Sequence, residues 1–267
     1  MPKRLNDDNP LPLGWLENFL EKADLERSFN ELGGLTHFYV EALRGSIRSQ
    51  QLRFDEAWEH FDRANELSEK APENIPNLIR QFLLHIWCFE NALVEAPLVE
   101  GEFEPPELQI PPIPEEILRD YPEVKLVINL RRLSEALLRL HLGHFEESAE
   151  IYRALIEDNP KERGDVLAKF YVGLGACEHN LGYREESLRT LENAGFALLS
   201  GGKLLNRVMQ AGILYAVYQH IGEDEQAESW MSYLKAQPCP AATIEIYNRR
   251  GQILLDRCTE KSSCLVI

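Results

Sequence analysis

Apolar residues recur every three to four positions along most of the chain, the spacing that places them on one face of an α-helix. Gly, Pro and Asn-Pro clusters interrupt this pattern at short intervals and mark helix ends. We therefore predict an all-α protein without β-sheet. The predicted helices span residues 15–32, 36–51, 55–70, 76–95, 124–142, 146–158, 163–181, 185–199, 204–221, 225–236 and 241–257.

A seven-residue segment that ends one predicted helix and opens the next occurs three times. The copies span 142–148, 181–187 and 221–227 and contain Gly143, Gly182 and Gly222. These glycines are about forty residues apart, a period found in helical repeat arrays. Each copy predicts one helix–turn–helix hairpin, and such a hairpin buries its apolar face only by stacking on a neighbour.

The hairpins resemble the tetratricopeptide repeat (TPR), which has a glycine at its turn, a small–aromatic–small stripe on its second helix and a closing proline. The hairpin around Gly182 matches best, with Gly175 on the first helix and Ser187, Leu191 and Ala194 on the second. The resemblance implies a TPR-like α-solenoid, a right-handed superhelical stack of antiparallel helix hairpins. At the large position of the stripe we expect buried side chains, namely Tyr152, Leu191 and Met231.

The resemblance extends to an earlier hairpin and departs from the family at two points. Residues Phe54 to Ala64 carry the stripe of a second helix, but Leu52 stands where the turn glycine belongs. The repeat spacing also exceeds the roughly 34 residues of the family, which indicates longer loops or helix ends.

A proline-rich, acidic stretch at Ala96–Pro114 divides the predicted array, because its six prolines oppose regular helix. We predict one solenoid over residues 1–258, followed by a flexible C-terminal tail. The parts of the solenoid are an N-terminal helix and first repeat (15–71), an inserted helix and Pro/Glu-rich loop (72–122), three repeats (123–236) and a capping helix (240–258); the tail covers 259–267.

The negative net charge disfavours two classes of binding partner. The chain has 44 acidic against 28 basic residues and a net charge of −16, which opposes binding to nucleic acid and to anionic membranes. No apolar run reaches the length of a membrane span, and the polar N-terminus does not resemble a signal peptide. The five cysteines form no CxxC pair and indicate reduced thiols. We therefore expect a cytoplasmic protein.

No residue pattern predicts catalysis, a cofactor or a metal site. His141 and His144 lie on opposite sides of the turn glycine, so their side chains are expected to diverge. Paired acids such as Glu146-Glu147 open second helices, where they complement the helix dipole. We therefore predict a non-enzymatic protein without catalytic residues, cofactors or bound metal.

The first helices of the hairpins are expected to line a concave groove, the surface on which helical solenoids hold partners. Apolar positions such as Tyr39, Leu43, Ile213 and Ala216 belong to this inner face. The polar candidates for ligand contact are Lys169, His179, Asn180, Gln219 and His220. Some members of the family hold a partner's C-terminal carboxylate with Lys and Asn; here only Lys169 and Asn180 have that chemistry, so such a clamp is not expected.

The function that follows is an adaptor or scaffold that binds a protein or peptide segment in this groove. An alternative stays open: a structural or regulatory subunit of a larger complex that works through its convex face or an oligomer interface, with the groove filled by the proline-rich insertion. The pattern does not distinguish between oligomeric states.

The chain ends in Cys264-Leu265-Val266-Ile267, which has the cysteine–aliphatic–aliphatic–X form of a prenylation signal. Lipidation at Cys264 predicts weak membrane association, strengthened if Cys258 is acylated as well. The alternative is an unmodified tail, and no strong membrane binding is then expected.

Overall fold

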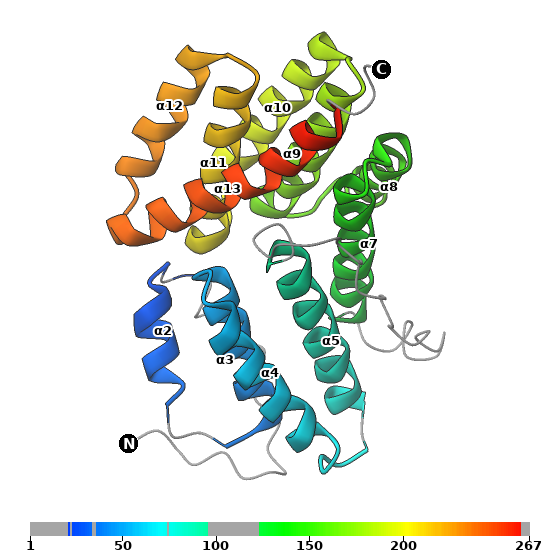
Figure 1. Cartoon of the computed structure of the whole chain (residues 1–267), viewed down its shortest axis with the longest axis vertical. Coiled ribbons are helices and arrows are strands. Elements are labelled where there is room, and N and C mark those ends of the chain that lie inside the picture. The colour runs from blue at the N-terminus through cyan, green and yellow to red at the C-terminus, as the bar shows by residue number, and fades with distance from the viewer. Residues whose placement is uncertain (1–20, 22, 34–35, 74, 96–122, 263–267) are drawn as a thin grey trace. The chain divides into compact units, whose positions relative to one another are not determined.

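The computed structural model describes residues 21, 23–33, 36–73, 75–95 and 123–262 (Figure 1). Every regular element within these ranges is a helix, so the predicted all-α class is confirmed. The helices are α2 (Leu25–Glu31), α3 (Phe38–Gln50), α4 (Phe54–Ser68), α5 (Ile75–Glu95), α7 (Glu123–His141), α8 (Phe145–Asp158), α9 (Gly164–Asn180), α10 (Arg184–Leu199), α11 (Leu204–His220), α12 (Asp224–Lys235) and α13 (Ala241–Ser262).

Helix bounds differ from the predicted ranges most at the two ends of the chain. The predicted helix over 15–32 is not continuous, because Ala23 and Asp24 are not helical and Ala23 has a φ of 48°. Ala23 is fully buried, so tertiary packing overrides its strong helix preference. At the other end α13 continues to Ser262, beyond the predicted end at 257. The proline-rich stretch 96–114 and Cys264 lie outside the described residues.

The chain divides into two compact units. Unit 1 contains the described residues between Leu25 and Ser134, and therefore α2 to α5 and the first part of α7. Unit 2 contains Glu21, Ala23 and Asp24 together with the residues from Glu135 onward.

Four hairpins share one turn geometry: α3–α4, α7–α8, α9–α10 and α11–α12. In each, the third residue after the helix end donates its amide to a carbonyl five residues earlier, as in a Schellman motif. These bonds are all 2.9 Å long and join Arg53 to Arg48, His144 to Arg139, Tyr183 to Glu178 and Glu223 to Tyr218. The next helix then begins at once, with acids in its first turn that complement the helix dipole.

The turn requires one residue in the left-handed region. Gly143, Gly182 and Gly222 adopt φ of 80°, 82° and 78°, which glycine reaches without strain. Leu52 takes the same place with a φ of 61°, in a region that costs an L-residue about 1–2 kcal/mol. The first hairpin therefore keeps the turn of the others although it lacks the glycine.

Small residues on first helices face large ones on second helices, as the stripe pattern predicts. A Cβ added to Gly45 would lie 2.6 Å from the Phe61 ring, and one on Gly175 would lie 2.8 Å from Leu191. Gly173 makes the same kind of approach to Tyr152 of α8. The helices therefore pack closely only because these positions have no side chain.

Two of the three expected core residues of the stripe are buried and one is not. Tyr152 and Leu191 are 1% and 0% exposed, which confirms the prediction for both. Met231 is only half-buried, so the expectation was wrong there. The reason lies in packing: α13, the last helix, contacts α11 far more extensively than α12, and the stripe of α12 stays partly open.

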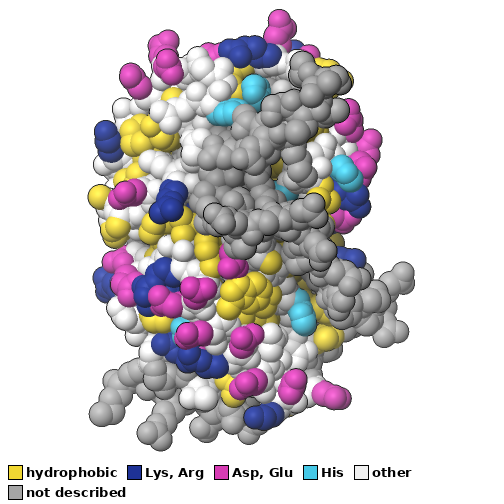
Figure 2. Space-filling view, viewed as in Figure 1, with side chains coloured by type: hydrophobic (Ala, Val, Ile, Leu, Met, Phe, Trp, Pro, Cys, Tyr) yellow, Lys and Arg dark blue, Asp and Glu magenta, His cyan; other side chains and the backbone are white. Residues whose placement is uncertain are grey.

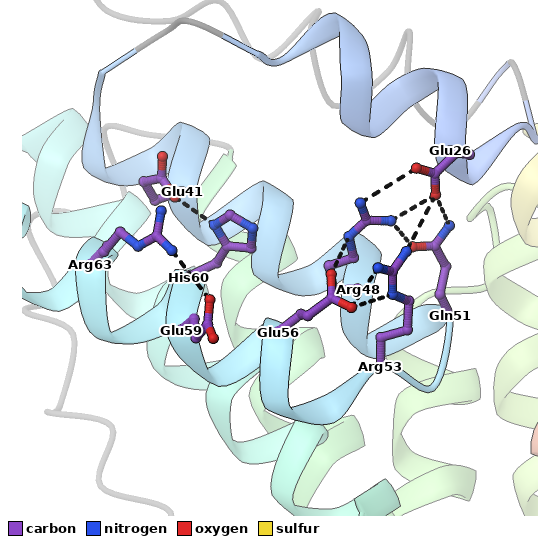
Figure 3. A network of polar contacts seen from close by, with 9 residues as sticks. All are labelled: Glu26, Glu41, Arg48, Gln51, Arg53, Glu56, Glu59, His60 and Arg63. Atoms are coloured by element: carbon purple, nitrogen blue, oxygen red, sulfur yellow. Dashed lines mark hydrogen bonds and ion pairs between the residues drawn. The ribbon is translucent and has the colours of Figure 1, made fainter.

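Charged side chains hold α2 against the first hairpin in unit 1 (Figure 3). The Arg48 guanidinium of α3 lies 2.7 Å from Glu26 of α2 and 3.3 Å from Glu56 of α4. The same guanidinium stacks 3.4 Å above the Phe29 ring, a favourable cation–π geometry. Deeper between α3 and α4, Glu41 contacts His60 at 2.7 Å.

Candidate functional site

The structure brings together two of the predicted ligand-binding residues, His179 and His220. They lie in the last turns of α9 and α11, the first helices of successive hairpins, which pack against each other within unit 2. Their ring centroids are 5.7 Å apart and the planes meet at 81°, an edge-to-face contact. His179 precedes the turn glycine of its repeat by three residues and His220 precedes its own by two, so the contact joins adjacent rather than equivalent positions of two repeats.

Burial and neighbouring charges favour the neutral form of His179 by lowering its pKa. Burial lowers the pKa of His179, and the nearby His220 and Arg184 lower it further. A neutral imidazole donates one hydrogen bond and accepts another, so His179 can make two polar contacts.

Arg184 belongs to the same region, and the sequence interpretation missed it. Its guanidinium donates to the Ile221 carbonyl at 3.2 Å and pairs with Glu223 at 2.5 Å, which ties the start of α10 to the α11–α12 turn. The interpretation considered first helices only, whereas Arg184 opens a second helix. A signal was present: Phe54 and Phe145 occupy the same place in two other hairpins, so the arginine departs from the pattern.

The other three predicted residues are less closely grouped. Asn180 is half-buried and donates its amide to the Ala176 carbonyl at 2.8 Å, a bond within its own helix. Gln219 is exposed beside His220. Lys169 is half-buried and lies ten residues before His179, about 15 Å away along α9. The histidines, Asn180 and Gln219 therefore form a strip at the helix ends, which we call the end strip, and Lys169 lies outside it.

Neither first helix, α9 or α11, exposes a carboxylate. Those of α9 are buried in polar contacts, and α11 has none. Asp165 accepts hydrogen bonds from Asn206 at 2.7 Å and from the Lys203 amide at 3.3 Å, and thereby holds the start of α11. Glu178 accepts a 2.7 Å bond from Thr190 of α10. Helix α11 contains no acidic residue at all.

Many exposed acids of unit 2 lie on the second helices, although Glu21 and, on α13, Glu245 are exposed as well. The first turns of α8, α10 and α12 each expose two acids. On the face drawn in Figure 2, acidic side chains are spread widely with Lys and Arg among them. Helices α9 and α11 therefore expose no acid of their own beside the end strip, and Glu223 in the turn after α11 is paired with Arg184.

The corresponding face of the first hairpin is already covered. Tyr39 and Leu43, which the repeat pattern assigns to the inner face of α3, are 1% and 3% exposed. Tyr39 stacks on Trp87 of α5 with centroids 5.9 Å apart, and burial raises the pKa of its hydroxyl to about 12. In unit 1 helix α5 thus covers the inner face of α3.

Thiol chemistry has little support in the described part of the chain. Burial, together with the charge of Asp62, raises the pKa of Cys88 to about 12, which suppresses the reactive thiolate. Cys177 is buried and lies 3.3 Å from the Ser148 hydroxyl. Across the described residues no three His, Cys, Asp or Glu side chains converge, and the histidine pair alone supplies fewer ligands than a structural zinc site needs.

None of the helices in the described ranges has the length and apolar character to cross a lipid bilayer.

The chain matches no protein-family model, and comparison with curated proteins and with solved structures likewise gives no significant match.

Proposed function

We propose that the protein is a TPR-like, non-enzymatic adaptor of the cytoplasm that binds a protein or peptide segment along the first helices of unit 2. The end strip of His179, Asn180, Gln219 and His220 is the polar part of this surface, and Lys169 extends it along α9. The repeated hairpins are proposed to continue as a right-handed solenoid.

The separation of charge in unit 2 is the observation that carries this proposal. A chain with a net charge of −16 has first helices α9 and α11 whose acids are buried in polar contacts or absent. Polar side chains that packing does not require remain exposed or half-buried there. Such a surface accepts an extended or helical segment with carbonyl or carboxylate acceptors without like-charge repulsion.

Affinity capture with the intact chain tests the proposal. The variant Asn180→Ala with His220→Ala removes two polar groups of the end strip. The matched control, Glu186→Ala with Glu225→Ala, changes two exposed acids on second helices. We expect a partner that binds the wild type and the control but not the end-strip variant, with equal melting temperatures for all three. A partner that is lost only from the control variant would move the site to the second helices.

A second candidate function is a structural or regulatory subunit that works through the second helices, and one observation favours it. Phe196 and Leu199 of α10 are 72% and 61% exposed and lie one turn apart. Beside them, Trp230 of α12 packs over Gly195. Exposed aromatic and aliphatic side chains grouped in this way often mark an interface.

Replacing both residues with serine tests this second function. If α10 carries the interface, Phe196→Ser with Leu199→Ser abolishes complex formation or self-association in light scattering, while Asn180→Ala with His220→Ala leaves it intact. If the groove carries the function, the two variants behave in the opposite way.

A further inference from the structure

The last helix, α13 (Ala241–Ser262), lies across α11 and makes only slight contact with α12, the helix that precedes it in the chain (Figure 1). A short Pro-containing turn, Gln237 to Pro240, separates α12 from α13. Helix α13 therefore does not extend the order of hairpins. It returns to the first helix of the preceding hairpin.

The contact between α13 and α11 is close on both sides. A Cβ on Gly212 of α11 would lie 3.0 Å from the Tyr247 Cβ. A Cβ on Gly251 of α13 would lie 2.8 Å from the Ala216 Cβ and 3.3 Å from the Ile213 Cα. Each helix thus supplies a glycine that lets the other backbone approach.

Three residues of α13, spaced four apart, form its buried stripe: Thr243, Tyr247 and Gly251. Tyr247 is 0% exposed, and burial raises the pKa of its hydroxyl. The Thr243 hydroxyl donates to the Ala23 carbonyl at 3.1 Å within the same unit. The stripe therefore has the order small residue, tyrosine, small residue. It packs against α11 over about three helical turns and contacts Ala23.

The surface under α13 is the one that the repeat pattern assigns to a partner. Ile213 and Ala216 belong to the inner face of α11, the same face that ends in Gln219 and His220. In unit 1 the equivalent face of α3 is covered by α5 through Tyr39 and Trp87. In each unit, a helix from outside the hairpins occupies the inner face of a first helix.

We propose that α13 is a ligand in cis. The inner face of α11 is a helix-binding surface whose occupant presents a small residue, a tyrosine and a second small residue at four-residue intervals, and a partner helix with this pattern displaces α13. The proposal rests on the proposed function in one respect, that this face is where partners bind. Only molecules in which α13 is released can bind a partner. The apparent Kd for the partner therefore equals the intrinsic Kd divided by the released fraction.

A peptide in trans tests this directly with the full-length chain. Gly251→Leu places a large side chain against Ala216 and releases α13 without changing α11. The probe is a fluorescent peptide of residues 241–262. We expect the Gly251→Leu chain to bind the probe saturably and at least about tenfold more tightly than the wild type does. The matched control Glu245→Leu, on the exposed side of α13, should behave as the wild type.

Two results would overturn the proposal. One is a folded Gly251→Leu chain that fails to bind the wild-type peptide. The other is equal binding of a peptide that itself carries Tyr247→Ala. Should Gly251→Leu not fold, hydrogen exchange of the wild type decides: amides of 241–252 must exchange through a local opening that leaves α9 and α10 protected. Exchange of α13 only together with those helices would show a fixed structural element.

The peptide assay needs no natural partner, so its failure is distinguishable from failure of the proposed function. Loss of capture by the Asn180→Ala, His220→Ala variant remains informative when the peptide does not bind. A bound peptide likewise remains informative when capture yields no partner.

Discussion

The hairpin α3–α4 of unit 1 and the hairpin α9–α10 of unit 2 have the same backbone turn but use different chemistry. In α9–α10 the turn residue is Gly182, Gly175 faces Leu191, and the Ser187 hydroxyl donates to the Gly175 carbonyl at 2.8 Å. In α3–α4 the turn residue is Leu52, and Ala57 replaces the serine.

Both hairpins pack a glycine of the first helix against a large side chain of the second, and the first hairpin adds a network of ion pairs. Arg48 contacts Glu26 and Glu56, and Glu41 contacts His60 between the helices. In α9–α10 the charged group between the helices is Glu178, which accepts a 2.7 Å bond from Thr190 and lies 3.5 Å from Arg153 of α8. One repeat geometry is thus compatible with two sets of interactions, and the free energy each contributes can be measured separately.

The largest expected effect lies in the shared core stripe. Phe61→Ala and Leu191→Ala should each lower the free energy of unfolding by about 2–5 kcal/mol, because both side chains are fully buried. Met231→Ala, at the equivalent but half-buried place, should cost about 1 kcal/mol. Urea denaturation measures all three. An equal cost for Met231→Ala and Leu191→Ala would show that the packing of α12 is different from the one described.

The second effect separates the charged hairpin from the small-residue hairpin. Arg48→Ala should cost about 1–3 kcal/mol, since its side chain is 6% exposed and its carboxylate and aromatic partners lose their contacts. The control, Arg189→Ala on exposed α10, should stay within about 0.5 kcal/mol. If Arg48→Ala and Arg189→Ala lower the melting temperature equally, the network around Arg48 stabilises unit 1 no more than an exposed ion pair does.

The third effect concerns the turns. Leu52→Gly relieves a left-handed leucine and should stabilise the protein by up to about 1 kcal/mol, although the more flexible unfolded chain offsets part of the gain. Gly182→Ala should destabilise the protein by about 1 kcal/mol, because alanine is strained at a positive φ. No steric clash adds to this cost, since no atom lies within 4 Å of the added Cβ. Paired denaturation curves test both signs. A destabilising Leu52→Gly would contradict the shared turn.

The smallest effect is a difference in pH dependence. The folded pKa of His179 is lowered from 6.5, so the unfolded chain takes up the proton first and stability falls as pH drops through about 6.5. For Glu41, burial opposes ionisation, but the His60 hydrogen bond and the charges of Arg44 and His60 outweigh it and lower its pKa from 4.5. Its contribution is therefore present above about 4.5 and lost only below.

Denaturation at pH 7.5 and 5.5 separates the two groups. The wild type should lose more stability over this interval than His179→Gln does, whereas Glu41→Gln should parallel the wild type. Identical pH profiles for wild type and His179→Gln would show that His179 is not held neutral by the fold.

The helices and turns were predictable because helical periodicity and turn glycines are local signals. The hairpin with Leu52 was also predicted, because the stripe from Phe54 to Ala64 can be recognised without the turn glycine. The end of the first helix at Ala23 was not, because burial rather than propensity sets that break.

Half of the candidate site followed from the same logic. The repeat pattern placed His179 and His220 on the ends of successive first helices, where they contact each other although their positions in the repeat differ by one residue. The contact of Arg184 with Glu223 and the return of α13 onto α11 depend on long-range packing, which leaves no periodic trace in the chain.

The backbone at Leu52 tests most directly whether the first hairpin is a copy of those in unit 2. In isotopically labelled protein, the intraresidue amide–Hα nuclear Overhauser effect and the three-bond amide–Hα coupling report the sign of φ. A positive φ at Leu52, as at Gly143, Gly182 and Gly222, is the result expected from the shared Schellman turn. A negative φ at Leu52 would contradict it, and the two units would then have no common repeat.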